Sequence, residues 1–70
     1  MKFCKLTSDF FKMKRLPKKY PKLSHDSIDD IFDVLSMHED NTIIKVQLHK
    51  GEKIGYVYLS DVVEQLYVID

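Results

Sequence analysis

Hydrophobic and polar positions alternate most clearly in the second half of the chain. Over residues 42–49 apolar side chains alternate with polar ones, which is the period-two pattern of a half-buried strand. Residues 50–53 contain a glycine, which turns tolerate well. Residues 54–59 are rich in tyrosine and valine, as strands are. We therefore predict a hairpin of two antiparallel strands over residues 42–59.

Residues 62–69 fit two interpretations. Ser60 could cap a helix, and the apolar residues that follow it have a plausible helical spacing. However, six of the eight residues are β-branched, leucine or tyrosine, a composition that suits a pleated, buried surface. We favour a strand here, with a helix as the alternative.

The N-terminal third predicts a short strand followed by a helix. Residues 2–6 mix apolar side chains with lysines and are expected to form the strand. Thr7 and Ser8 are suitable helix caps, and Pro17 should end the helix because proline cannot continue the hydrogen-bond ladder. The apolar stripe of this helix would consist of Phe10, Met13 and Leu16.

A second amphipathic helix is predicted after Ser24, ending at residues 39–41. Its buried stripe follows the i, i+3, i+4, i+7 spacing and contains Ile28, Ile31, Phe32 and Leu35. The opposite face carries Asp26, Asp29, Asp30 and Asp33, which we expect to be solvated, although such a face could bind a cation or a basic partner. The expected fold is therefore α+β in the order β-α-α-β-β-β, with two N-terminal helices packed on one face of an antiparallel sheet.

Length and composition predict one domain over residues 1–70. A hydrophobic content of 44% allows a packed core, and no run approaches the roughly 18 apolar residues of a membrane span. The N-terminal lysines are not followed by an apolar segment, so we expect no secretory signal, a cytoplasmic location and no membrane partner. With the single Cys4 and no metal-ligand spacing elsewhere, we expect no disulfide, metal or cofactor.

The net charge of zero conceals two oppositely charged parts. Residues 1–23 carry eight basic side chains against Asp9 alone, whereas residues 24–70 carry three lysines against ten acids. This asymmetry suggests a cationic surface for an anionic partner, or two parts that neutralise each other within one fold. Residues 12–22, with Tyr20 among the lysines, are the best candidate for contact with nucleic acid.

Two stretches resemble the RelE/ParE toxin superfamily of toxin–antitoxin systems. The first is KRLPKKYPKL at residues 14–23, followed by the acid-rich predicted helix; the second is KIGYVY at residues 53–58 together with VEQLYVI at residues 63–69. The chain would be a shortened or degenerate member, since it ends at Asp70, near where active members place a catalytic side chain. The resemblance implies a metal-independent endoribonuclease (an mRNA interferase) that acts on mRNA at the ribosome, or inhibits gyrase, with an antitoxin protein as partner.

Cleavage by such a toxin needs an acid, a base and cations around one phosphate. The resemblance implies catalytic roles for His49, Lys53 and Lys45, with Lys53 in the place of the family's arginine. It also implies RNA or phosphate binding by Lys50, Lys14, Arg15, Lys18 and Lys19. Each of these side chains also has an ordinary interpretation as a solvated surface residue.

Two alternatives to the toxin are compatible with the sequence. The chain could be a non-catalytic protein-interaction module that binds an antitoxin or a host protein. It could also be a small nucleic-acid-binding module that uses residues 12–22.

Overall fold

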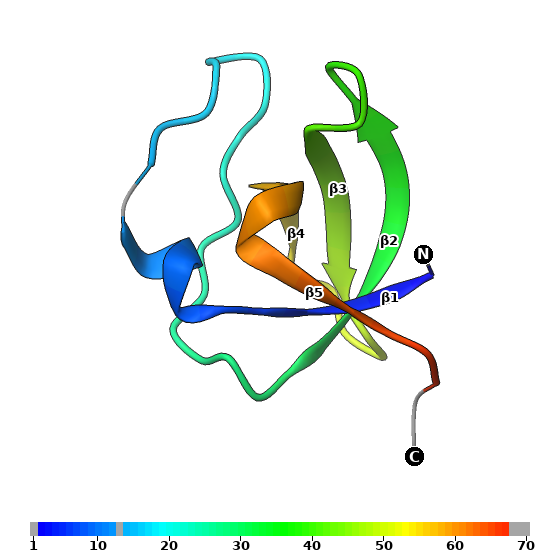
Figure 1. Cartoon of the computed structure of the whole chain (residues 1–70). Helices are drawn as coiled ribbons and strands as arrows, with labels where there is room; N and C mark the ends of the chain where they lie inside the picture. Colours follow the sequence, from blue (N-terminus) through cyan, green and yellow to red (C-terminus); the bar gives the residue numbers. More distant parts are fainter. Residues whose placement is uncertain (1, 13, 68–70) are drawn as a thin grey trace.

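Five antiparallel strands form a single curved sheet in the computed structural model, which describes residues 2–12 and 14–67 (Figure 1). The elements are β1 (Phe3–Leu6), the 3₁₀ turn η1 (Ser8–Lys12), β2 (Ile31–His38), β3 (Ile43–Leu48), β4 (Ile54–Tyr58), the 3₁₀ turn η2 (Leu59–Asp61) and β5 (Val62–Gln65). The strand order is β4-β3-β2-β1-β5, and every neighbouring pair is antiparallel. The two ends of the described chain therefore pair with each other, through β1 and β5.

The predicted α+β fold with two N-terminal helices is wrong. The second predicted helix is instead a loop over residues 24–30 followed by strand β2. Aspartate, serine, isoleucine and phenylalanine are mediocre helix formers, whereas β2 is rich in residues that strands favour. A register shift between Val34 and Ser36 interrupts the alternation of β2, so its apolar residues matched a helical spacing as well as a strand.

The first predicted helix is also shorter than expected. Only η1, a five-residue 3₁₀ turn, forms after β1, and its Phe10 is buried while Phe11 is exposed. Met13, part of the predicted apolar stripe, lies outside the described residues. Pro17 and Pro21 lie in the extended loop that replaces the rest of the helix.

The strand predictions are confirmed. Residues 2–6 contain β1, and the predicted hairpin is β3 and β4. Residues 62–69 begin as the favoured strand, which the structure describes as β5; residues 66–67 follow the strand, and residues 68–70 lie outside the described part.

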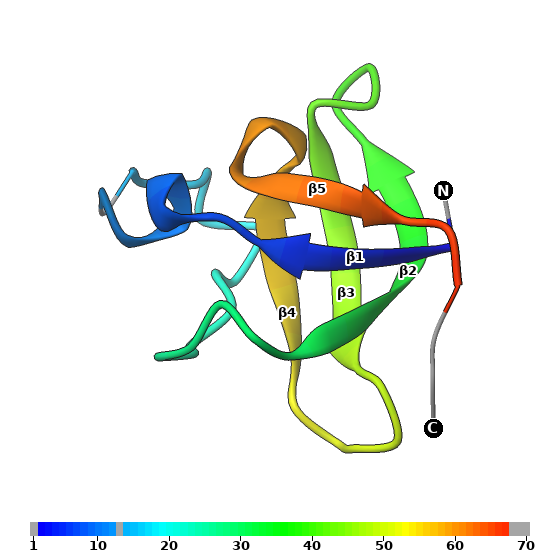
Figure 2. The ribbon, with the colours of Figure 1, turned by 60° about the horizontal axis from the view of Figure 1, so that its bottom comes forward.

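The sheet bends so that β1 and β5 cross over β3 and β4 and enclose one core (Figure 2). The fully buried side chains Phe32, Ile44, Val46 and Val57 come from three different strands. Phe10 of η1 and Leu23 of the long loop join the same cluster. The first four strands form a meander, and β5 follows the 3₁₀ turn η2 and returns to pair with β1.

The long loop between η1 and β2 protects the outer edge of β4. The Leu23 amide donates to the Tyr56 carbonyl and the Tyr56 amide donates to the Pro21 carbonyl, both at 2.9 Å. Gly55, beside Tyr56, allows this approach because a Cβ there would lie 2.5 Å from the Leu23 Cα. In the described part of the chain, no strand pairs with the outer edge of β5.

The structure has no helix long and apolar enough to cross a membrane within residues 2–12 and 14–67.

Cys4 on β1 is fully buried, and burial together with the negative charge of Asp33 raises its thiol pKa from 9.0 to about 11. We expect an aromatic disulfide reagent at pH 8 to leave the folded protein unmodified and to react once urea unfolds it, because the thiolate is the nucleophile. The raised pKa also favours the folded state below pH 9, and this contribution should be lost as pH rises from 9 to 11. Full modification of the native protein at the rate of a free thiol would contradict this prediction.

A basic, apolar hollow as the candidate binding site

The predicted catalytic residues Lys45 and His49 have separate neighbours. Lys45 lies on β3, with its ammonium 5.9 Å from the centroid of the Tyr56 ring on β4. His49 follows β3, and its Nδ1 lies 2.8 Å from a carboxylate oxygen of Asp33 on β2. Asp33 therefore orients the imidazole of His49, whereas the ammonium of Lys45 faces an aromatic ring.

Lys53 and Lys50 lie in the turn between β3 and β4. The ammonium of Lys53 lies 3.0 Å from Nδ1 of His25, a loop residue whose other ring nitrogen faces Asp30 at 2.8 Å. Lys50 adopts a positive φ of 60°, a conformation that turns require. Each of the three predicted catalytic side chains thus has its own partner, rather than a shared space around one phosphate.

Four of the five predicted phosphate-binding residues lie in the loop between η1 and β2, and two of these four are ion-paired. Lys14 lies 3.1 Å from Asp61 of η2, and Lys19 lies 3.1 Å from Glu39 at the end of β2. Both bridges join the basic third of the sequence to the acidic remainder. Of the two interpretations of the charge asymmetry, these contacts support neutralisation within the fold.

The Lys19 bridge includes a third residue, Tyr20. The Tyr20 hydroxyl donates to Glu39 at 2.7 Å. The hydrogen bonds from Tyr20 and Lys19 lower the pKa of Glu39, and the same bond to Glu39 raises the pKa of Tyr20. Glu39 is therefore anionic at neutral pH and forms an ion pair with Lys19.

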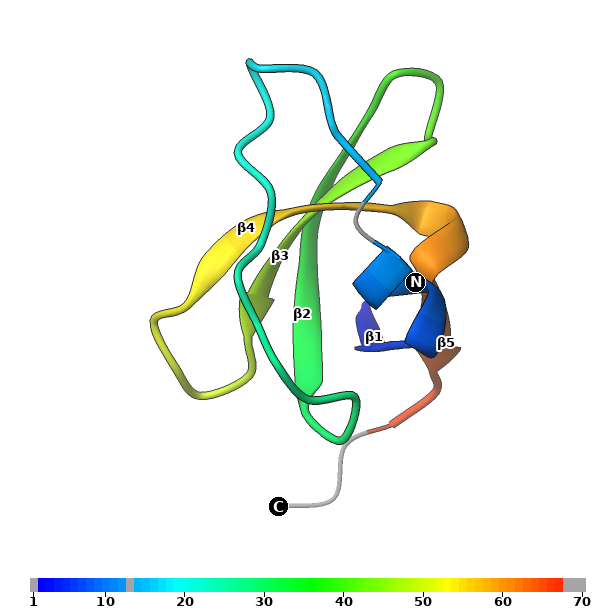
Figure 3. The same ribbon diagram turned by 90° about the vertical axis from the view of Figure 1, so that its left-hand side faces the viewer.

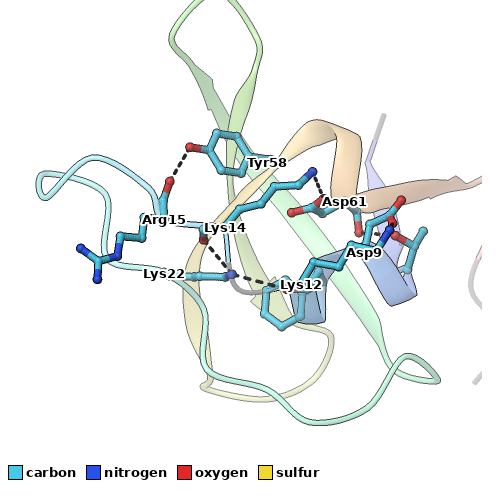
Figure 4. A network of polar contacts seen from close by, with 9 residues as sticks. Asp9, Lys12, Lys14, Arg15, Lys22, Tyr58 and Asp61 are labelled. Carbon is cyan, nitrogen blue, oxygen red and sulfur yellow. Dashed lines mark hydrogen bonds and ion pairs between the residues drawn. The ribbon is translucent and has the colours of Figure 1, made fainter.

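Asp61 is a buried carboxylate that the sequence did not single out. It is 1% exposed; Lys14 contacts its Oδ1, and no described group bonds its Oδ2. A buried carboxylate needs a countercharge. Lys14 is therefore held toward η2, as Figure 4 shows, rather than extended into solvent.

An open apolar hollow of about 640 Å³ lies between η1 and the loop that follows it. Its walls are Phe10, Phe11, Lys14, Arg15, Leu16, Lys22 and Leu23. The phenylalanines come from η1, Leu16 from the outgoing arm of the loop, and Leu23 from the returning arm beside β4. The floor is hydrophobic and the rim is basic.

Lys22 fixes the walls of the hollow. Its ammonium lies 3.0 Å from the Lys14 carbonyl, 3.4 Å from the Phe10 carbonyl and 4.9 Å from the centroid of the Phe10 ring (Figure 4). The Tyr58 hydroxyl donates to the Arg15 carbonyl at 2.6 Å and anchors the outgoing arm to β4. These bonds hold η1 and the arm at a fixed separation, so the hollow is formed before anything binds.

Arg15 differs from its neighbours. Figure 4 shows its guanidinium extending away from the network, and no described group pairs with it. Phe11, which lines the same hollow, is 41% exposed. The hollow therefore presents an apolar floor together with one available guanidinium, which can hold a carboxylate through two hydrogen bonds.

The residues that line the hollow are four apolar and three basic side chains. The described residues contain no group of three or more histidine, cysteine, aspartate or glutamate side chains that could hold a metal ion. The sequence located the basic residues but not the hollow, for which the adjacent Phe10 and Phe11 were the only signal. A scan against protein-family models and searches of curated proteins and of solved structures found no match to this chain. The RelE/ParE resemblance thus stays an untested prediction, and the helices that it implied are absent from the described fold.

Proposed function

We propose that this protein is a non-catalytic protein-interaction module. Its hollow binds a segment of a partner protein that combines a large apolar side chain with neighbouring carboxylates. The observation that carries this proposal is the apolar floor of Phe10, Phe11, Leu16 and Leu23 beside the available guanidinium of Arg15. Concave apolar surfaces with a few polar groups at their rim are typical of binding sites.

The arrangement of the predicted catalytic side chains favours binding over RNA cleavage. An mRNA-cleaving toxin would need Lys45, His49 and Lys53 to act on one phosphate. Lys45 faces Tyr56, His49 faces Asp33, and Lys53 faces His25. These separate contacts argue against a shared site at which the three side chains cleave RNA.

The charges around the hollow favour a protein partner over nucleic acid. Affinity for nucleic acid comes mainly from several cations that contact successive phosphates. Here Lys14 and Lys19 are ion-paired and Lys22 is bound to backbone carbonyls. Among the described residues of this loop, Arg15 and Lys18 are the cations with no partner within the fold. Of these two cations only Arg15 lines the hollow, and one guanidinium beside an apolar floor suits an acidic protein segment better than a phosphate backbone.

Selection from a phage-displayed random peptide library tests the proposal. We expect enriched peptides to share a large apolar or aromatic residue next to aspartate or glutamate. The affinity of a selected peptide should fall about tenfold or more with Arg15→Glu and with Phe11→Ser, because each removes a central contact. The matched control is Lys2→Glu, an equal charge reversal on an exposed residue outside the hollow, and thermal melts should show that all variants stay folded.

Two results would contradict the proposal. One is the absence of any enriched peptide that depends on Phe11. The other is binding of a single-stranded RNA oligonucleotide that falls steeply with salt and is lost in Arg15→Glu and Lys18→Glu, which would favour the nucleic-acid module instead.

A further inference from the structure

The chain itself displays a segment of the chemistry that the hollow fits. Residues 24–30 form a loop between Leu23 and β2, with Ile28 44% exposed. Asp26 and Asp29 flank Ile28, are exposed, and have side chains with no partner among the described residues. An apolar side chain between free carboxylates therefore projects into solvent. Ile28 does not fill the hollow of its own chain, since close to half of its surface is accessible.

The hollow and this acidic loop lie on the same side of the molecule. Figure 3 looks onto that side and shows η1, the two arms of the long loop, and the acidic loop at the lower end of the returning arm. The residues that line the hollow belong to η1 and to these two arms. When two complementary surfaces share one face, a two-fold axis can bring each loop to the hollow of the other copy. Such a contact is closed and stops at two copies.

We propose that a second copy of this chain occupies the hollow and forms a reciprocal dimer. Ile28 of each copy packs on Phe11 and Leu16 of the other, and the carboxylates of Asp26 and Asp29 face Arg15. The charge separation supports this occupant, because the hollow belongs to the basic third of the sequence and the loop to the acidic remainder. The inference rests on the proposed function, since it names one partner of the same hollow.

The dimer should be weak and should regulate access to the hollow. Two small contacts bury less surface than a stable interface requires, so we expect a dissociation constant on the order of 0.1 mM. A peptide that binds the hollow competes with the second copy. High local concentration would therefore close the site, and a tighter-binding partner would open it.

Sedimentation velocity tests the dimer directly. Between about 10 µM and about 1 mM the wild-type protein should shift from monomer to dimer and no further, and about 500 mM NaCl should weaken the association. Two charge-reversed variants should each raise the dissociation constant about tenfold or more. The first is Arg15→Glu, and the second combines Asp26→Lys and Asp29→Lys in one chain. An equimolar mixture of these two variants should dimerise again. In the mixed dimer, one contact between hollow and loop keeps the native charges, and in the other both sides are reversed and still attract each other. Lys2→Glu and Glu52→Lys serve as charge-reversal controls and should dimerise like the wild type.

A spin label on Ser24→Cys locates the contact. Cys4 is buried and its thiol pKa is raised, so the introduced thiol is modified selectively. The spin-labelled variant, made without isotope labelling, is mixed with isotope-labelled wild type. We expect line broadening at Phe11 and Leu16 of the isotope-labelled copy.

A monomer at every concentration would overturn this inference, as would a mixture of charge-reversed variants that fails to dimerise or broadening confined to other residues. In those cases library peptides that still need Phe11 and Arg15 would leave the proposed function standing. If such peptides also fail to appear, both proposals fall.

Discussion

Gly55→Ala is expected to destabilise the domain by about 3 kcal/mol, at the upper end of the cost of overpacking. A Cβ at Gly55 would lie 2.5 Å from Cα and 2.7 Å from N of Leu23. Both are backbone atoms, and the hydrogen bond from the Leu23 amide to Tyr56 holds them in place. The methyl group can be accommodated only if the loop separates from β4.

Thermal unfolding followed by circular dichroism measures this cost. In a domain of this size, 3 kcal/mol corresponds to a fall in Tm of about 15 °C. Gly51→Ala is the matched control, because the new Cβ would meet the flexible Leu48 side chain, at 2.9 Å from Cδ2, rather than backbone. Since Leu23 also lines the hollow, Gly55→Ala should weaken peptide binding as well. Equal losses of Tm in the two variants would show that the contact with Leu23 does not set the cost.

Phe32→Ala should cost about 3–5 kcal/mol, which is comparable with the whole stability of a small domain. Phe32 is fully buried in β2 at the centre of the core, and the His25 ring meets it edge-on with centroids 5.0 Å apart. Removing the ring leaves a cavity that strands on either side of β2 can close only in part.

Urea unfolding and the dispersion of amide resonances measure the effect of Phe32→Ala. We expect a largely unfolded protein at 25 °C. Phe11→Ala is the matched control: its ring is 41% exposed, so its loss should cost about 1 kcal/mol or less while it impairs the hollow. A well-dispersed, stable Phe32→Ala protein would contradict the position of Phe32 in the core.

Local patterns predicted the strands because each strand carries its own evidence. The alternation in β3 and the tyrosines and valines of β4 are properties of adjacent residues. The strand β2 was predicted as a helix because local patterns were the only guide. The irregularity between Val34 and Ser36 shifts the phase of its apolar residues, and only the pairing with β3 reveals the strand. Helical spacing was therefore a misleading guide once a bulge was present.

The candidate site was less predictable, since its properties depend on residues far apart in the sequence. Lys14 appears free in the sequence, yet its partner is Asp61, 47 positions away. Lys22 likewise appears to be a surface cation, although its ammonium is bound to the backbone carbonyls of Phe10 in η1 and Lys14 in the loop. The sequence located the basic corner, but only tertiary structure distinguishes the available Arg15 from the occupied lysines.

The pairing of β1 with β5 has a consequence for synthesis of the chain. Phe3 pairs with Gln65 and Leu6 with Val62, so β1 obtains one of its two neighbours only after β2, β3 and β4 have been made. A nascent chain that still lacks residue 65 exposes the edge of β1, and contacts this distant in sequence form slowly. We therefore expect the sheet to close only after β5 has left the exit tunnel, however early β1 emerges.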